Sequence, residues 1–230
     1  QGIYPFYKKI PRSILLCTDE SIMGTPFYLM ERITGIIIRK DNPEHSPELY
    51  KALSIESAVE LANIHSIPPQ ALPHLGKPKG YVQRQISGWI ARHQNAQTTN
   101  IDGMEELNQW LSKNIPTEQG NHIIHNDYKY DNLVLSPTDH KISAVLDWEM
   151  TTRGCPLMDL GASLGYWLEP QDAEELRSLP FCPTHMPGNL NRAEFVDTYA
   201  HARGILVPDP SFYLVYGVWR LIIILEQIYK

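Results

Sequence analysis

The chain has 230 residues, of which 43% are hydrophobic and 20% charged, with a formal net charge of −6 and a pI near 5.8. This composition is sufficient for a packed core, and the acidic balance argues against a nucleic-acid surface, which would be basic. Cys17, Cys155 and Cys182 lie far apart and lack the paired spacing of a zinc site or disulfide framework. We therefore expect a cytoplasmic protein without a nucleic-acid partner.

The first two thirds of the chain are predicted to contain extended segments at residues 27–30 and 36–38, and then helices. Three stretches carry apolar residues at helical spacing: residues 55–64, 82–90 and 104–111. Pro68 and Pro69 stop the first of these helices. Residues 70–80 are punctuated by Pro and Gly and are predicted to form a loop.

The C-terminal part of the chain is also predicted to be helical. Asn191 followed by Glu194 is a capping pair that opens a helix ending at Gly204. Residues 212–229 are rich in apolar side chains but are interrupted by Arg220, Glu226 and Gln227. We expect this last segment to be a buried helix and not a membrane span.

The most informative stretch runs from His125 to Asn132 and is followed fifteen residues later by Asp147. Phosphoryl transfer from ATP needs a carboxylate for the acceptor hydroxyl's proton and oxygen ligands for magnesium on the phosphates. Protein kinases supply these with an Asp, an Asn five residues later, and a second Asp that opens Asp-Phe-Gly. Asp127 precedes Asn132 by the same five residues, and Lys129 lies two residues after Asp127. We therefore predict Asp127 as the general base, with Lys129 beside it.

A predicted hairpin gives the spacing of the metal ligands a physical meaning. Residues 133–135 and 142–146 are short β-branched runs, and residues 136–141 between them carry turn signals. Pairing of the two strands would bring Asn132 close to Asp147. Two oxygen-bearing side chains would then converge on one point, which suits a magnesium ion that keeps water and phosphate as its other ligands.

Two further residues of this region are candidates with two interpretations each. His125 is a candidate catalytic residue that either titrates or, as we favour, orients the loop through hydrogen bonds. Glu149 is either a second or water-mediated metal ligand, or a solvated carboxylate. If the segment after Asp147 is extended, Glu149 faces the same way as Asp147 while Trp148 faces the core.

The spacing after Asp147 separates small-molecule kinases from protein kinases. Only twelve residues run from Asp147 to Asp159, without the Ala-Pro-Glu that closes an activation segment. This region resembles the aminoglycoside phosphotransferase superfamily, and within it the branch found beside or fused to acyl-CoA dehydrogenases. Further matches to that branch lie at residues 24–32, 126–129, 166–167, 216–220 and 226–229.

The resemblance implies a fold and a division into two lobes. The fold would be α+β and protein-kinase-like, with a mostly helical large lobe, a small catalytic β-hairpin and part of a β-rich small lobe. Residues 1–34 would be the remainder of the small lobe with its hinge, and residues 35–230 the large catalytic lobe. Backbone groups of the hinge residues Met30, Glu31 and Arg32 would contact adenine.

The chain departs from the family pattern in several places. Most members have Gly where this chain has Asn126, and the family's Gly-Asp-Pro is here Gly154-Cys155-Pro156. No Gly-rich phosphate loop precedes Asp127, and Lys8 and Lys9 are expected to be solvated and not ATP ligands. Because the chain begins with Gln1, we expect further upstream residues that complete the small lobe, without which ATP would be bound poorly. The resemblance assigns Asp159 to a bracing role beneath the catalytic loop.

The predicted function is an ATP- and magnesium-dependent phosphotransferase acting on a hydroxyl group of a small molecule, without a membrane partner. The dehydrogenase-associated branch makes a hydroxylated acyl compound the candidate acceptor. Arg220 either braces an internal group or holds an anionic part of the acceptor, because a buried guanidinium requires an anionic or carbonyl partner. Two alternatives stay open: a catalytically silent nucleotide- or metabolite-binding protein, and a metal-dependent phosphohydrolase using His122, His125, Asp127 and Asp147.

Overall fold

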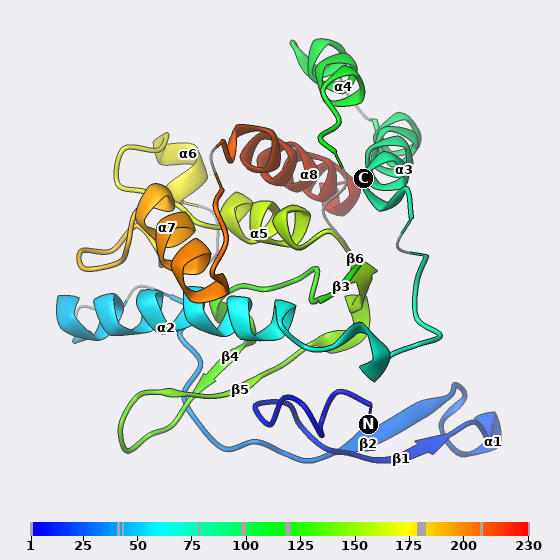
Figure 1. Ribbon diagram of the computed structural model, residues 1–230, viewed down its shortest axis with the longest axis vertical. Helices are drawn as coiled ribbons and strands as arrows, with labels where there is room; N and C mark the ends of the chain where they lie inside the picture. The colour runs from blue at the N-terminus through cyan, green and yellow to red at the C-terminus, as the bar shows by residue number, and fades with distance from the viewer. Residues whose placement is uncertain are drawn as a thin grey trace.

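Two β-hairpins lie below a layer of helices in the computed structural model (Figure 1), which describes residues 2–40, 42, 44–77, 79–97, 100–117, 121–178, 183–207 and 209–229. Cys182 lies outside the described residues, and neither Cys17 nor Cys155 forms a disulfide within the described part of the chain. The strands are β1 (Ser13–Cys17), β2 (Phe27–Met30), β3 (His122–Ile124), β4 (Leu133–Leu135), β5 (Ile142–Val145) and β6 (Thr152–Gly154). The helices are α1 (Glu20–Met23), α2 (Pro47–His65), α3 (Tyr81–Ala96), α4 (Met104–Lys113), α5 (Pro156–Gly165), α6 (Glu174–Arg177), α7 (Arg192–Arg203) and α8 (Ser211–Tyr229).

The helices confirm most of the sequence prediction. Helix α2 begins earlier than its apolar spacing indicates, because Ser46 caps it by accepting a hydrogen bond from the Leu49 amide and Pro47 occupies its first turn. Helix α7 opens with the predicted capping box between Asn191 and Glu194 and ends at Gly204 with a φ of 65°. In the predicted loop at residues 70–80, the only helical or strand structure among the described residues is the end of one short 3-10 turn, Pro69–Ala71.

Helices α5 and α8 form the centre of the helical layer, and glycines let them approach closely. A Cβ atom added to Gly217 of α8 would collide with the carbonyl oxygen of Gly161 in α5. Gly165 of α5 also lies against the backbone of Gly217. By length and composition α8 could cross a membrane, and 44% of its most apolar 18-residue window is buried inside the protein. Its packing on α5, α3 and α4 accounts for this apolar character.

The predicted hairpin forms between β4 and β5, with Leu133 opposite Val145 and Val134 opposite Ala144. The segment predicted to be extended at residues 36–38 forms only one bridge, between Ile36 and Leu135. Strand β3 pairs with β6, an arrangement that the three-residue length of each strand hid from sequence analysis. Strands β1 and β2 pair with each other, and many of their apolar side chains are exposed.

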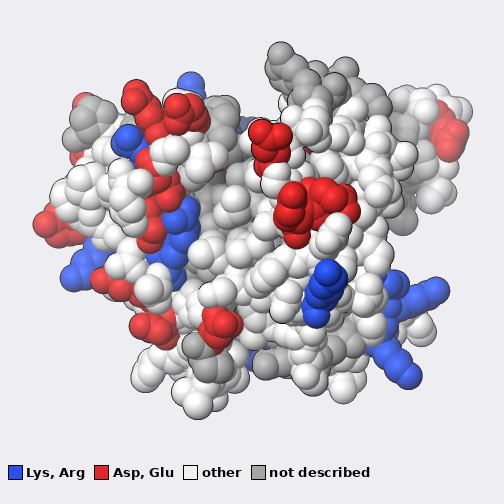
Figure 2. Space-filling model, turned by 90° about the horizontal axis from the view of Figure 1, so that it is seen from above, with Lys and Arg blue, Asp and Glu red and all other residues white. Residues whose placement is uncertain are grey.

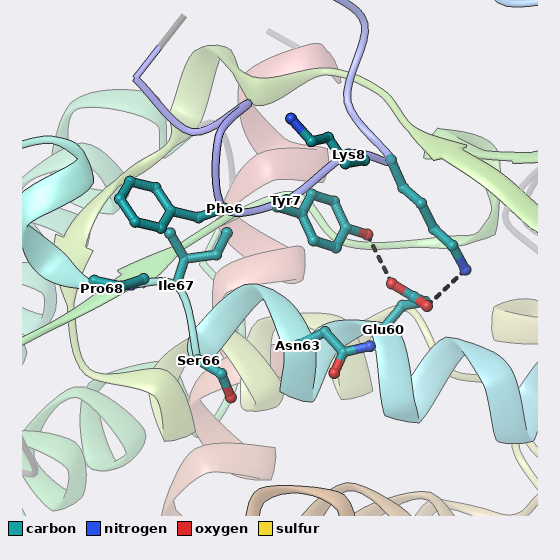
Figure 3. A pocket seen from close by; sticks show the side chains of 9 residues that line it. Phe6, Tyr7, Lys8, Glu60, Asn63, Ser66, Ile67 and Pro68 are labelled. Carbon is teal, nitrogen blue, oxygen red and sulfur yellow. Dashed lines mark hydrogen bonds and ion pairs between the residues drawn. The ribbon is translucent and has the colours of Figure 1, made fainter.

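The segment before β1 is held against α2 by a small polar network (Figure 3). The Tyr7 hydroxyl donates to Glu60 over 2.9 Å, and Lys9 Nζ lies 2.7 Å from Glu60 and 3.1 Å from Glu56. Burial lowers the pKa of Lys9, but its two carboxylate partners outweigh burial and raise it overall. Lys9 is therefore an anchor of the N-terminal segment, and the expectation that it is simply solvated was wrong.

Two glycine-to-alanine changes, one inside the α5–α8 contact and one in open space, should have opposite effects on the free energy of unfolding. Gly217→Ala should lower the free energy of unfolding by about 1–3 kcal/mol, because the added methyl group overpacks the helix crossing. Gly88 is exposed in α3 with open space around it, so Gly88→Ala should raise that free energy by about 0.5–1 kcal/mol. Urea unfolding of both variants measures the two values, and equal effects would contradict the packing described here.

Candidate active site

A fully buried carboxylate fixes the loop that carries Asp127. Asp159, in the first turn of α5, accepts hydrogen bonds from the backbone amides of His125 (2.6 Å) and Asn126 (2.8 Å). His65 of α2 lies 3.0 Å from the same carboxylate and 2.7 Å from the Tyr199 hydroxyl. Burial disfavours the Asp159 anion, but these hydrogen bonds outweigh burial and hold the pKa of the carboxyl below its usual value. The geometry is that of the brace that the resemblance implied.

His125 is oriented by backbone groups at both ring nitrogens. Its Nε2 lies 2.9 Å from the carbonyl oxygen of Leu146, and its Nδ1 accepts from the Asp127 amide at 3.3 Å. The ring is fully buried, with the Trp148 ring centroid 4.9 Å away, and burial lowers the pKa of His125. A neutral imidazole with Nε2–H donating and Nδ1 accepting satisfies both contacts, which is the loop-orienting role.

The Asp127 carboxylate is held between two side chains of its own loop. Lys129 Nζ lies 2.9 Å from both of its oxygens, and Asn132 Nδ2 donates to its Oδ2 over 3.0 Å. Burial lowers the pKa of Lys129, but its hydrogen bonds to Asp127 raise it overall, so the ammonium stays charged. Asn132 also donates to the backbone oxygen of Asp127 over 2.7 Å, which leaves its Oδ1 as the atom available to a ligand.

The hairpin brings the predicted metal ligands together as the spacing indicated. The Leu146 amide, at the end of the hairpin, donates to the carbonyl oxygen of Asn132 at its start over 2.7 Å. Asp147 follows with a left-handed φ of 62°, which turns the chain away from the strand. The next residues, Trp148–Met150, form one turn of 3-10 helix. The prediction of an extended segment after Asp147 was therefore wrong. Glu149 nevertheless lines the same cavity as Asn132 and Asp147.

This cavity, of about 500 Å³, lies between the β1–β2 hairpin and the predicted metal ligands. Its described lining residues are Ile10, Pro11, Ser13, Tyr28, Met30, Arg39, Asp131, Asn132, Leu146, Asp147, Trp148 and Glu149. Of the three predicted hinge residues, Met30 lines it. Glu31 does not, and instead its carboxylate lies 3.6 Å from Arg12 while its amide donates to the Arg12 carbonyl oxygen. Arg32 is exposed and also outside the lining.

Several residues of the site were missed by sequence analysis. Arg39 lines the cavity but follows an unremarkable run of isoleucines. His65 and Tyr199 support Asp159 from helices that are distant in sequence. Only the α2–α7 packing brings these two residues together, so no sequence spacing could have identified them. Tyr28 shares the cavity with Met30, and its two-residue spacing along β2 was a usable signal.

The alternative phosphohydrolase cluster is not assembled. His122 Nδ1 lies 3.1 Å from the carbonyl oxygen of His65 and faces Arg203, whereas His125 is bound to Leu146. Among the described residues, no three His, Cys, Asp or Glu side chains are placed to hold a metal ion together. A magnesium site built from Asn132, Asp147 and nucleotide phosphates needs no such group.

A second pocket lies apart from this site, between the N-terminal segment and the end of α2 (Figure 3). Its described lining residues belong to residues 6–9 and 60–68 and include none of the predicted catalytic or metal-binding residues. On the face seen in Figure 2, acidic and basic side chains are intermixed near α6 and α7, and the described residues form no continuous basic patch there. Arg192, for example, is paired with Glu169 and Asp172.

Known proteins resemble the chain over nearly its whole length. The model of the phosphotransferase enzyme family, APH, matches residues 3–213. Human acyl-CoA dehydrogenase family member 11 is 32% identical over 96% of this chain, and the chain spans 29% of that relative's length. A crystal structure described as an aminoglycoside phosphotransferase of Ralstonia eutropha JMP134 is 32% identical, with a TM-score of 0.84 over 99% of this chain and 70% of that one.

A more distant structure shares the fold alone. An aminoglycoside phosphotransferase APH(4)-Ia mutant, solved with ADP and hygromycin B, is 13% identical, with a TM-score of 0.62 over 99% of this chain and 77% of that one. The protein-kinase-like α+β fold is thus shared with phosphotransferases of known structure. The chain belongs to the phosphotransferase enzyme family, in the branch that includes the acyl-CoA dehydrogenase family members.

Proposed function

We propose that the protein is an ATP- and magnesium-dependent phosphotransferase that acts on a hydroxyl group of a small molecule. The observation that carries this proposal is the cavity beneath the β1–β2 hairpin, which Asn132 and Asp147 both line, with Asn132 hydrogen-bonded to the Asp127 carboxylate. In this assignment residues 1–34 supply the small-lobe wall of the cavity and residues 35–230 form the catalytic lobe. Family membership supports the reaction class.

The chemistry of the cavity fits a nucleotide and a divalent cation. Three of its described lining side chains are carboxylates, those of Asp131, Asp147 and Glu149. One described lining side chain, that of Arg39, is a cation, so negative charge is in excess. Oxygen ligands with excess negative charge suit Mg²⁺, and Asn132 Oδ1 and the Asp147 carboxylate would hold it, with Glu149 as a further ligand. Bound magnesium would neutralise charge on the nucleotide phosphates. Apolar walls from Ile10, Tyr28 and Met30 suit a purine base, and ADP occupies the distant APH(4)-Ia structure.

The chain's own residues have distinct parts in this proposal. Asp127 would orient the acceptor hydroxyl and accept its proton, and the Lys129 ammonium, 2.9 Å from both carboxylate oxygens, would fix the direction of the carboxylate. His125 and Asp159 fix the backbone that carries Asp127. For the acceptor we propose a hydroxylated acyl compound, which rests on the likeness to acyl-CoA dehydrogenase family members.

A catalytically silent binding protein is the second candidate, and one observation favours it. Among the described residues no lysine lines the cavity: Lys9 is held by Glu56 and Glu60, and Lys8 lies over the Tyr4 ring. A lysine on the phosphates is part of the usual kinase machinery. Nucleotide binding by the full-length protein without phosphoryl transfer to water or to any hydroxyl acceptor would identify this second function.

The first prediction of the proposal concerns the base. Asp127→Asn keeps the shape of the side chain but removes the carboxylate, so kcat should fall by about 10²–10⁴-fold while nucleotide affinity changes little. ADP formation and ADP binding by the purified variant measure the two quantities. Asp139→Asn makes the same chemical change at an exposed carboxylate in the β4–β5 turn and should leave both unchanged. Near-normal turnover by Asp127→Asn would refute the role of the base.

The second prediction concerns the metal ligands. Asp147→Ala should abolish magnesium-dependent activity, and Asn132→Ala should raise the magnesium concentration for half-maximal activity to a smaller extent, because a charged ligand dominates attraction to a dication. The half-saturating concentration is the proper measure, since Asn132 also holds Asp127 and its loss lowers the rate for that second reason. A stronger magnesium requirement in Asn132→Ala than in Asp147→Ala would reverse the assigned roles.

A further inference from the structure

We infer that Arg220 of α8 is a positioning residue that sets the direction of Asp127 by holding the backbone carbonyl of Asn126. Its catalytic consequence rests on the proposed function, whereas its structural basis does not. Arg220 is 6% exposed in the mostly apolar helix α8. Its Nη2 donates to the Asn126 carbonyl oxygen over 2.8 Å.

The partner of this buried guanidinium is a loop carbonyl and not a carboxylate. In the part of the chain that the structure describes, Arg220 makes no ion pair, and its Nε is buried without an acceptor. Its guanidinium carbon lies 5.2 Å from the centre of the Trp89 ring. Burying a charge without an anionic partner is costly. The hydrogen bond to the Asn126 carbonyl and the contact with Trp89 are therefore the interactions that offset this cost among the described residues.

Asn126 needs such support because of its backbone conformation. It has a φ of 68°, a left-handed conformation that Asn tolerates better than other non-glycine residues, at a cost of about 1 kcal/mol or more. Its amide donates to Asp159, its Oδ1 accepts from the Tyr81 hydroxyl at 3.0 Å, and its Nδ2 donates to the Met150 carbonyl oxygen at 2.9 Å. The carbonyl group is its remaining polar group, and Arg220 binds it.

The carbonyl of Asn126 controls Asp127 directly, because both belong to one peptide plane. The oxygen of residue 126 and the amide of residue 127 are rigidly coplanar. Arg220 holds the oxygen side of this plane, and His125 Nδ1 accepts from the amide side at 3.3 Å. Rotation of the plane would swing the Asp127 carboxylate, and a displacement of about 1 Å can cost about 100-fold in rate.

The neighbouring Arg92 provides a matched control. Its guanidinium carbon also lies over the Trp89 ring, at 4.5 Å, but Arg92 is exposed and donates no hydrogen bond that the structure describes to the catalytic loop. Removing either arginine takes a cation from the same tryptophan. Only the removal of Arg220 frees the carbonyl of Asn126.

The experiment compares Arg220→Met, Arg220→Lys and Arg92→Met in the full-length protein. The readouts are amide hydrogen exchange of the peptide covering residues 122–132, basal hydrolysis of magnesium–ATP with water as acceptor, and affinity for ADP. Arg220→Met should accelerate exchange of this peptide by about tenfold or more, because a charge-assisted hydrogen bond is lost. It should lower kcat by about 100-fold with ADP affinity retained. Arg92→Met should match the wild type in all three.

The conservative variant keeps the inference testable if Arg220→Met fails to fold. Lysine retains the charge but not the planar fork of donors, so Arg220→Lys should give faster loop exchange and a lower kcat, smaller than the effects of Arg220→Met. The inference would be overturned if Arg220→Lys had the loop exchange rate and kcat of the wild type. It would also be overturned if Arg220→Met and Arg92→Met gave the same loop exchange rate and kcat. If the wild type transfers phosphate neither to water nor to any hydroxyl acceptor, the proposed function fails, while the exchange measurement still decides whether Arg220 holds the loop.

Discussion

The carboxylate of Asp159 is the interaction on which the rest of the site depends. It is fully buried, and burying such an anion is costly unless hydrogen bonds compensate it. The donors are two consecutive loop amides and His65, so the start of α5, the end of α2 and the catalytic loop are locked to one point. Movement of the loop would break the hydrogen bonds of a buried charge. The backbone directly before Asp127 is therefore held in place.

Around that fixed point the fold assembles two further surfaces. The β4–β5 hairpin places Asn132 and Asp147 at one edge of the loop, and the β1–β2 hairpin closes a cavity over them. Helix α8 packs tightly on α5, and its Arg220 reaches the carbonyl of Asn126. The loop is therefore held by Asp159 of α5 and by Arg220 of α8.

The sequence predicted the parts of the site that are close together along the chain. Asp127, Asn132 and Asp147 were identified because a loop and a hairpin convert their spacing directly into proximity. It could not predict His65, Tyr199 or Arg39, because only tertiary packing brings these residues to the site.

Local errors have local causes. The segment after Asp147 was expected to be extended, but a left-handed residue and a 3-10 turn replace the strand. The departure at Asn126 has an explanation in the structure: this position has a left-handed conformation, which Gly adopts freely and Asn tolerates, and the Asn side chain adds contacts that Gly lacks. The sequence left two roles open for Arg220, bracing an internal group or holding an anionic part of the acceptor. It could not choose between them, because a buried guanidinium can bind a carboxylate or a carbonyl group.

Phosphorus NMR of the full-length protein with ATP, magnesium and a hydroxylated acyl compound is the most direct test of the central claim. The account predicts that the γ-phosphate resonance of ATP is replaced by those of ADP and a phosphate monoester of the acceptor. Formation of inorganic phosphate alone, whichever hydroxyl compound is supplied, would indicate hydrolysis. Unchanged ATP in the presence of demonstrated binding would contradict phosphoryl transfer altogether.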